Sequence, residues 1–226
     1  MSNAPLLILR LDGLMQSWGE RARWDSRDTN PFPTKSGVIG LIACAMGLKR
    51  GDMAIRELAE EVTIGIRADR AGALMTDFQT ITGDLITAEG KRRAKHGETT
   101  TILSRRQYLF DAAFLVVISG PEDTLERISA ALLQPKWQIF LGRKSCVPAR
   151  PVFESMTRAY ATVEEALRMI PLSARTDSGK VFLCELEDPA GNYTRRDHPL
   201  NTPSRHYSNR RIRKFSVEAP REKVDL

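Results

Sequence analysis

Apolar runs and amphipathic stretches alternate along the first two thirds of the chain, and their order predicts a mixed α and β domain. Residues 5–11 form an apolar run that is typical of a buried strand. Small side chains recur three or four positions apart between Thr34 and Leu48, which predicts a helix whose small face lies close to a sheet. The other elements expected are helices over 52–61 and 121–133 and strands over 62–68, 74–81, 102–110 and 113–119.

Strand, helix, strand, strand and helix, followed by more extended chain, is the order of a ferredoxin-like βαββαβ unit. We therefore expect an α+β fold with one main domain over residues 1–150. Beyond this point the pattern predicts a short helix over 163–169 and a strand over 181–187, within a small C-terminal region over 151–226. Cations gather over 205–214, so this region is expected to include a basic tail.

One segment of the main domain has no apolar period. Residues 83–101 hold a run of cations between Gly90 and Gly97, and they separate two predicted strands. Such a segment predicts a long, basic hairpin tip. Its charged side chains are Lys91, Arg92, Arg93 and Lys95, with His96 beside them.

The composition narrows the class of partner. The chain has 226 residues, a formal net charge of +6 and a pI near 9.4, so an anionic partner is favoured over a cationic one. The three cysteines are far apart and lack the spacing of a zinc site or a disulfide scaffold. The N-terminus does not resemble a signal peptide, and no apolar run is long enough to cross a membrane. A cytoplasmic protein without cofactor or metal is expected.

Three short blocks combine cations, amides and aromatic side chains, the types that hold single-stranded nucleic acid by its phosphates and bases. In the third block a glycine allows close backbone approach, and adjacent cations and a hydroxyl suit phosphate oxygens. The candidate RNA-binding residues are Gln16 and Trp18 in the first block, Arg105, Arg106, Gln107 and Tyr108 in the second, and Gly142, Arg143, Lys144, Ser145 and Cys146 in the third.

Residues 34–37 resemble the end of a phosphate-binding P-loop, but the glycine expected just before Lys35 is absent. A nucleotide-hydrolysing site is therefore not expected. Lys35 and Ser36 still lie at a predicted helix start, where backbone N–H groups favour an anion, so they are candidates for an RNA phosphate.

Several side chains have two interpretations that the sequence leaves open. Trp18, Trp24 and Trp137 either stack on bases or belong to the core. Strand alternation puts Tyr108 on the same face as Arg106, and the sequence does not say whether that face points to a ligand or to the core. The types of His96, Lys95 and Tyr108 would also suffice for a metal-independent ribonuclease with a histidine base.

Four blocks together resemble the CasD family, the RNA-binding subunits of the type I-E CRISPR Cascade complex. They are residues 11–19, 32–41, 106–114 and 141–153, and they agree with the family in order and spacing. The resemblance covers most of residues 6–153.

The resemblance implies an RRM-like fold of the repeat-associated RNA-binding (RAMP) type, in which 83–101 is a β-hairpin thumb. It implies a non-catalytic subunit that holds the repeat-derived 5′ handle of the crRNA. Its implied neighbours are the large PAM-reading subunit, the terminal backbone subunit and, near the thumb, target DNA. Related subunits of type I-C systems cleave RNA, so an endoribonuclease that processes CRISPR precursor RNA remains the alternative.

Overall fold

The computed structural model describes residues 3–21, 25–83, 86, 90–91, 99–173, 181–200 and 206–219. Within these ranges the chain forms a nine-stranded, mainly antiparallel sheet and four helices. In chain order the elements are β1 (Leu6–Gln16), β2 (Ser26–Arg27), α1 (Lys35–Met46), α2 (Met53–Glu61), β3 (Thr63–Arg70), β4 (Ala73–Gly83), β5 (Thr100–Ser119), α3 (Glu122–Leu133), β6 (Phe153–Thr157), α4 (Val163–Met169), β7 (Val181–Glu187), β8 (Tyr193–Pro199) and β9 (Tyr207–Glu218).

The mixed α and β class is confirmed, and most predicted elements are present. Thr34 caps α1 by accepting a hydrogen bond from the N–H of Gly37, and Asp52 caps α2 in the same manner. The strands expected over 102–110 and 113–119 are joined in the single strand β5. Asp111, whose φ is +56°, stands between the two predicted halves of β5. The first half pairs with β4, and the second pairs with β1 and β3.

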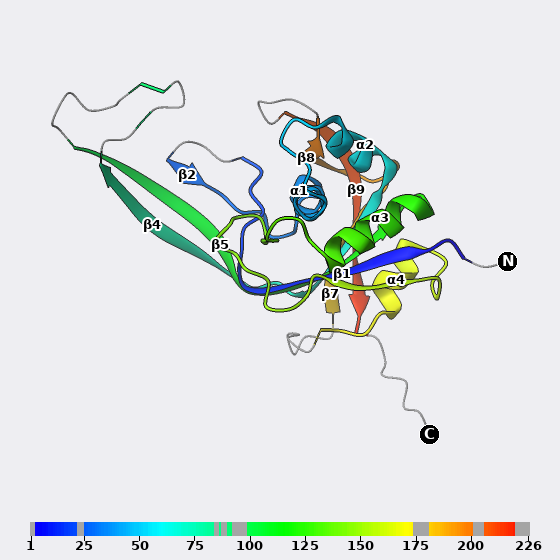
Figure 1. Ribbon diagram of the computed structural model, residues 1–226. Helices are drawn as coiled ribbons and strands as arrows, with labels where there is room; N and C mark the ends of the chain where they lie inside the picture. Colours follow the sequence, from blue (N-terminus) through cyan, green and yellow to red (C-terminus); the bar gives the residue numbers. More distant parts are fainter. Residues whose placement is uncertain are drawn as a thin grey trace.

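The main path of the sheet has the order β6-β1-β5-β3-β7-β9-β8 (Figure 1). Alternate residues of β1 point to opposite faces, as the period of a strand requires. Leu7 and Leu9 belong to the larger core cluster, which includes residues of α1 and α3. Leu6 and Ile8 belong to a second cluster together with residues of α4. Helices therefore cover both faces of the sheet, and none in the described part of the chain is long and apolar enough to cross a membrane.

Residues beyond 150 extend the same sheet. β6 pairs with β1, and β7 pairs with β3. The predicted basic tail is corrected, because residues 207–218 form β9 between β7 and β8. Several of its cations are paired within the protein, which explains how so basic a strand packs: Arg210 with Asp197, Arg213 with Glu164 and Asp188, and Lys214 with Glu185.

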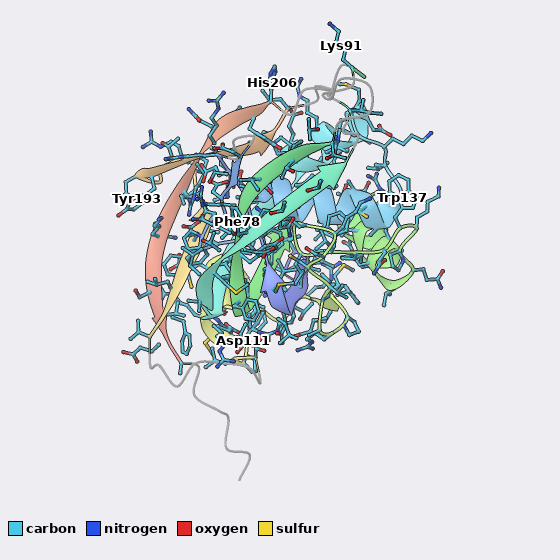
Figure 2. All side chains as sticks on the ribbon, turned by 90° about the vertical axis from the view of Figure 1, so that its left-hand side faces the viewer. Phe78, Lys91, Asp111, Trp137, Tyr193 and His206 are labelled. Carbon is cyan, nitrogen blue, oxygen red and sulfur yellow. The ribbon has the colours of Figure 1, made fainter. Side chains whose placement is uncertain are left out.

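The β4–β5 hairpin projects from the body as a long two-stranded ribbon (Figure 1). Its pairing runs from Ala73 opposite Phe110 to Gly83 opposite Thr100. This ribbon carries the segment that the sequence predicts to be a basic tip. Lys91 is exposed near the end of the ribbon (Figure 2). The other predicted tip residues, Arg92, Arg93, Lys95 and His96, lie outside the described residues.

Candidate nucleic-acid interface

A groove of about 1480 Å³ brings distant parts of the chain together. Its walls come from the β4–β5 hairpin, the β8–β9 hairpin, the segments 17–21 and 140–145, and the first two turns of α1. Among the described residues seven lysines and arginines line it, against two carboxylates. The cations are Arg21, Arg27, Arg50, Arg106, Arg143, Lys144 and Arg196, and the carboxylates are Glu20 and Asp28.

The two carboxylates are already engaged by the protein. Asp28 accepts a hydrogen bond from the backbone N–H of Arg21, at 2.9 Å. Glu20 accepts one from the side-chain amide of Asn30, at 2.6 Å, and pairs with Arg195. Because seven cations line the groove against two carboxylates, and one of the two pairs with Arg195, positive charge dominates the described lining.

All three predicted blocks meet in this groove. The predicted residues that line it are Trp18, Ser36, Arg106, Tyr108, Gly142, Arg143, Lys144 and Ser145. Those that do not line it are Gln16, Lys35, Arg105, Gln107 and Cys146. Lys144 and Ser145 are exposed, so their ammonium and hydroxyl groups are open to a ligand.

Gln16 and Trp18 form a buried polar contact rather than an open stacking platform. The Gln16 amide donates to the carbonyls of Leu11 and Ala112, at 3.0 and 2.8 Å, and its oxygen accepts from the indole N–H of Trp18, at 3.0 Å. Both side chains are buried. This corrects their predicted contacts with bases, because their hydrogen-bonding groups are satisfied inside the protein.

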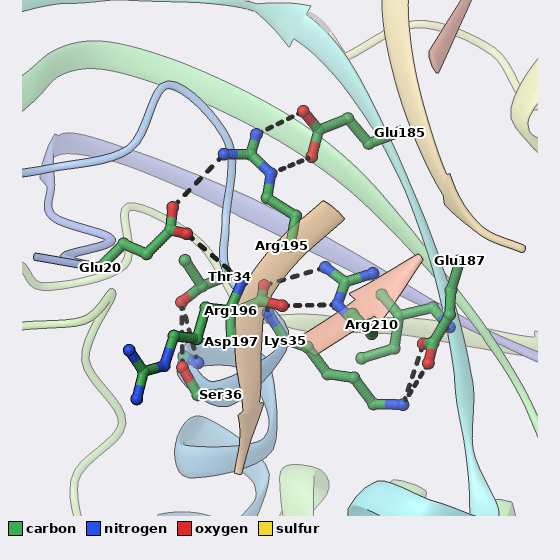
Figure 3. Close-up of polar contacts among 12 residues, drawn as sticks. Glu20, Thr34, Lys35, Ser36, Glu185, Glu187, Arg195, Arg196, Asp197 and Arg210 are labelled. Carbon is green, nitrogen blue, oxygen red and sulfur yellow. Dashed lines mark hydrogen bonds and ion pairs between the residues drawn. The ribbon is translucent and has the colours of Figure 1, made fainter. Parts of the chain in front are cut away.

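Lys35 also points inward. Its ammonium group donates to the carbonyl of Val62, at 2.9 Å, and to the carboxylate of Glu187, at 2.8 Å (Figure 3). Burial lowers the pKa of Lys35, and the Glu187 carboxylate opposes that shift. The predicted phosphate contact of Lys35 is therefore corrected, whereas Ser36, one residue later, does line the groove.

Arg143 holds three segments together. Its guanidinium donates to the carbonyl of Gln107 at 3.0 Å, and to those of Arg27 and Asp28 at 3.0 and 3.2 Å. The same group lies over the ring of Tyr108. The N–H groups of Arg143 were predicted to bind phosphate. They donate instead to backbone carbonyls, and they thereby hold the wall of the groove.

The register of the β4–β5 hairpin separates the two arginines of the second block. Arg106 stands opposite Asp77 and lines the groove, on the same face as Tyr108. Arg105 stands opposite Phe78 on the other face, with its guanidinium carbon 5.7 Å from the centre of the phenyl ring. The sequence left open whether the face shared by Tyr108 and Arg106 points to a ligand or to the core. Both apply in part, because Tyr108 is buried and yet lines the groove together with Arg106. Arg105 points outward on the opposite face.

Gly142 and Cys146 shape the third block. Gly142 has a φ of +89°, and a Cβ atom there would lie 1.8 Å from the carbonyl oxygen of Ser17. Cys146 is buried, and burial raises the pKa of its thiol. Both residues position the loop that carries Lys144 and Ser145.

The β8–β9 hairpin supplies a wall that the sequence analysis did not assign to the site. Arg195 pairs with Glu20 and Glu185, and Asp197 pairs with Arg210 (Figure 3). Arg196 lies between these anchored residues and lines the groove. Three ion pairs therefore hold β8 on either side of Arg196, and the exposed side chain of Arg196 lines the groove.

The sequence analysis also missed Arg50 and Tyr207 as groove residues. Arg50 follows α1 in a turn, and Tyr207 begins β9. The signal that could have found Tyr207 is its place in a cation-rich segment, which combines charge and an aromatic side chain as the other blocks do.

Of the three residues named for a ribonuclease, the structure describes Tyr108 alone. Tyr108 is buried beneath Arg143, and Lys95 and His96 lie outside the described residues. Within the described ranges, histidine, cysteine and carboxylate side chains form no group of three that could hold a metal ion.

Comparisons with known proteins agree with this architecture. A family model described as CRISPR-associated protein (Cas_Cas5) matches residues 6–213. The CRISPR system Cascade subunit CasD of Escherichia coli (strain K12) is 32% identical over 216 residues, which cover 90% of this chain and 92% of the relative.

Two solved structures are similar along nearly the whole chain. A chain of a CRISPR RNA-guided surveillance complex is 37% identical, with a TM-score of 0.77, and the match covers 95% of this chain and 91% of the other. A crystal structure of a Cas protein is 32% identical, with a TM-score of 0.72 and coverages of 95% and 97%. The chain belongs to the Cas5 family of CRISPR-associated proteins and is a homologue of the type I-E Cascade subunit CasD.

Proposed function

We propose that this chain is a non-catalytic RNA-binding subunit of a type I-E Cascade complex, and that its basic groove holds the 5′ handle of the crRNA. The observation that carries the proposal is the meeting of three sequence blocks, far apart in the chain, in one groove lined by seven cations. Similarity to CasD and to a chain of an RNA-guided surveillance complex supports the assignment. The exposed groove residues proposed to bind phosphate are Lys144, Ser145 and Arg196, with Arg106 beside them.

The proposed fold is ferredoxin-like, of the RAMP type. Four strands in the order β6-β1-β5-β3, with α1 after β1 and α3 after β5, have the connectivity of a βαββαβ unit. We assign the β4–β5 ribbon as the stem of the thumb, and we propose that the tip cations contact guide RNA and target DNA. The remaining proposed neighbours are the large PAM-reading subunit and the terminal backbone subunit, in a cytoplasmic complex. The division into residues 1–150 and a C-terminal region over 151–226 is part of the same proposal.

The test is the salt dependence of RNA binding. The purified full-length chain is titrated with single-stranded RNA of the repeat from its own CRISPR array, at several salt concentrations. Lys144→Ala and Arg196→Ala should each weaken binding and reduce the slope of log K against log salt by about 0.7, the value for one phosphate contact on a single strand. Arg127→Ala is the matched control, since Arg127 is exposed on α3 and does not line the groove. Equal slopes for all variants would overturn the proposed groove.

The same RNA, incubated with the chain in EDTA, tests the absence of catalysis. We expect binding without cleavage. Cutting at one site would make the chain a processing endoribonuclease, and His96→Ala would then be expected to stop the reaction.

A further inference from the structure

We propose that a side pocket of the basic groove receives one unstacked nucleobase of the bound RNA. The pocket has a volume of about 560 Å³ and shares residues of α1, the 140–144 segment and β9 with the groove. This inference rests on the proposed function, since it names where one base of that RNA would lie.

The pocket is deep on the side of α1 because this helix carries small side chains there. Gly40, Ala43 and Cys44 line it from one face of the helix. A Cβ atom at Gly40 would meet nothing within 4 Å, so the space above this position is empty. Leu48 and Ile55 add apolar surface to the same lining. Small residues at these positions leave room for a flat ring against the helix.

Aromatic side chains line the pocket from two other segments. Trp137 and Phe140 come from the chain that follows α3, and Tyr207 comes from the start of β9. Trp137 is 43% exposed, which is unusual for so large an apolar side chain, and Figure 2 shows it at the edge of the molecule. Aromatic faces stack on any nucleobase, and this is how proteins hold single-stranded nucleic acid.

The charge at the mouth favours a nucleobase over an apolar protein side chain. Arg50, Lys144 and His206 line both the pocket and the groove, whereas the carboxylate of Asp52 lines the pocket but not the groove. A sugar-phosphate backbone that passes through the groove would therefore lie against Arg50, Lys144 and His206 while its base enters the apolar pocket. Ser36 and Gln138 add a hydroxyl and an amide that can hydrogen-bond to the edge of the base.

The experiment scans the RNA and blocks the pocket. The full-length chain is titrated with the repeat RNA carrying a single abasic nucleotide at each position in turn. We expect one position to lose about tenfold or more in affinity, because stacking of one base is lost. Gly40→Leu should remove the difference between that abasic RNA and the intact RNA, and it should leave the salt slope unchanged. Gly40→Ala is the matched control, because a methyl group leaves most of the pocket open.

A second readout uses Trp137 as a reporter. RNA should quench tryptophan fluorescence, and Trp137→Phe should reduce that change by the contribution of Trp137, whereas the change that remains reports on Trp18 and Trp24. An abasic scan without a sensitive position would overturn the pocket. If the slope still responded to Lys144→Ala, the groove would stand and only the pocket would fall. If Gly40→Leu instead weakened co-purification with the other Cascade subunits and left RNA binding unchanged, the occupant would be a protein side chain.

Discussion

The guanidinium carbon of Arg143 lies 4.6 Å from the centre of the Tyr108 ring, so a cation predicted to bind RNA is stacked within the protein. Its N–H groups also reach three backbone carbonyls of two other segments. Lys144, the next residue, is exposed on the groove. Adjacent cations of one motif therefore differ, because Arg143 shapes the groove wall and Lys144 is exposed in the groove.

We expect Arg143→Ala to lower the free energy of unfolding by about 1–3 kcal/mol, because charge-assisted hydrogen bonds are lost. RNA affinity should fall as the wall loosens, with little change in the salt slope. Arg143→Lys should not restore the wall, since a lysine cannot present a planar fork to several carbonyls. The measurements are urea unfolding and RNA titration at several salt concentrations. A slope lower by about 0.7 with unchanged stability would instead show a direct phosphate contact.

Gly142→Ala should destabilise the protein by about 1–3 kcal/mol or more, since a non-glycine residue is strained at this conformation. The new methyl carbon would also lie 1.8 Å from the carbonyl oxygen of Ser17, which forces the loop to move. The measurement is urea unfolding, with Gly40→Ala as the contrasting variant. That change has open space and should stabilise α1 by up to about 1 kcal/mol. Equal stability of the two variants would contradict the prediction.

Asp69 connects two buried arginines. Its carboxylate accepts from Arg10 at 2.8 Å and from Arg67 at 2.6 Å, and its side chain is 0% exposed. Asp69→Ala would leave two guanidinium groups buried without this partner, at a cost of about 3–5 kcal/mol. The exposed pair of Arg56 and Glu60 is the control, and Glu60→Ala should change stability little, because solvent screens an exposed ion pair.

The midpoint of urea unfolding measures both changes to Asp69 and Glu60. If Asp69→Ala does not fold, Asp69→Asn keeps the shape and is expected to be less severe. A loss of stability at Asp69 no larger than that at Glu60 would disprove the role of the buried carboxylate.

His198 should make the protein less stable in mild acid. Burial lowers the pKa of His198 from its ordinary value of 6.5, and the Lys35 cation lowers it further. The unfolded chain therefore binds the proton more readily between the lowered pKa and 6.5, so stability falls as the pH drops through this window. Thermal unfolding at about pH 7.5 and pH 5.5 measures this change.

His198→Asn is the comparison for the pH experiment. The variant should lose less stability between the two pH values than the natural chain, because its side chain does not titrate. Glu187 and Glu60 oppose the shift at His198, and both carboxylates are present in both proteins. The same loss of stability in both proteins would place the titrating group elsewhere.

Local chemistry explains which parts of the fold could be predicted. The capping side chains of Thr34 and Asp52 and the periodic pattern of the helices act over a few residues, so α1, α2 and α3 were expected close to where they lie. β5 was expected as two strands, but the structure continues it through Asp111, and β1 pairs with residues on both sides of that position. β8 was not predicted, and β9 was taken for a tail, because their charged positions are explained by ion pairs that include residues of distant elements, such as Arg195 with Glu20 and Arg213 with Glu164.

The sequence by itself determined the order of most elements, the basic charge, the three blocks and the family to which they are similar. Only the tertiary structure decided which side chains face the groove. A step of one residue along a strand turns a side chain to the other face, so Arg105 and Arg106 separate, as do Arg195 and Arg196. Side-chain direction depends on strand register and on packing between segments far apart in the chain, and for this reason Lys35 is buried while Arg196 lines the groove.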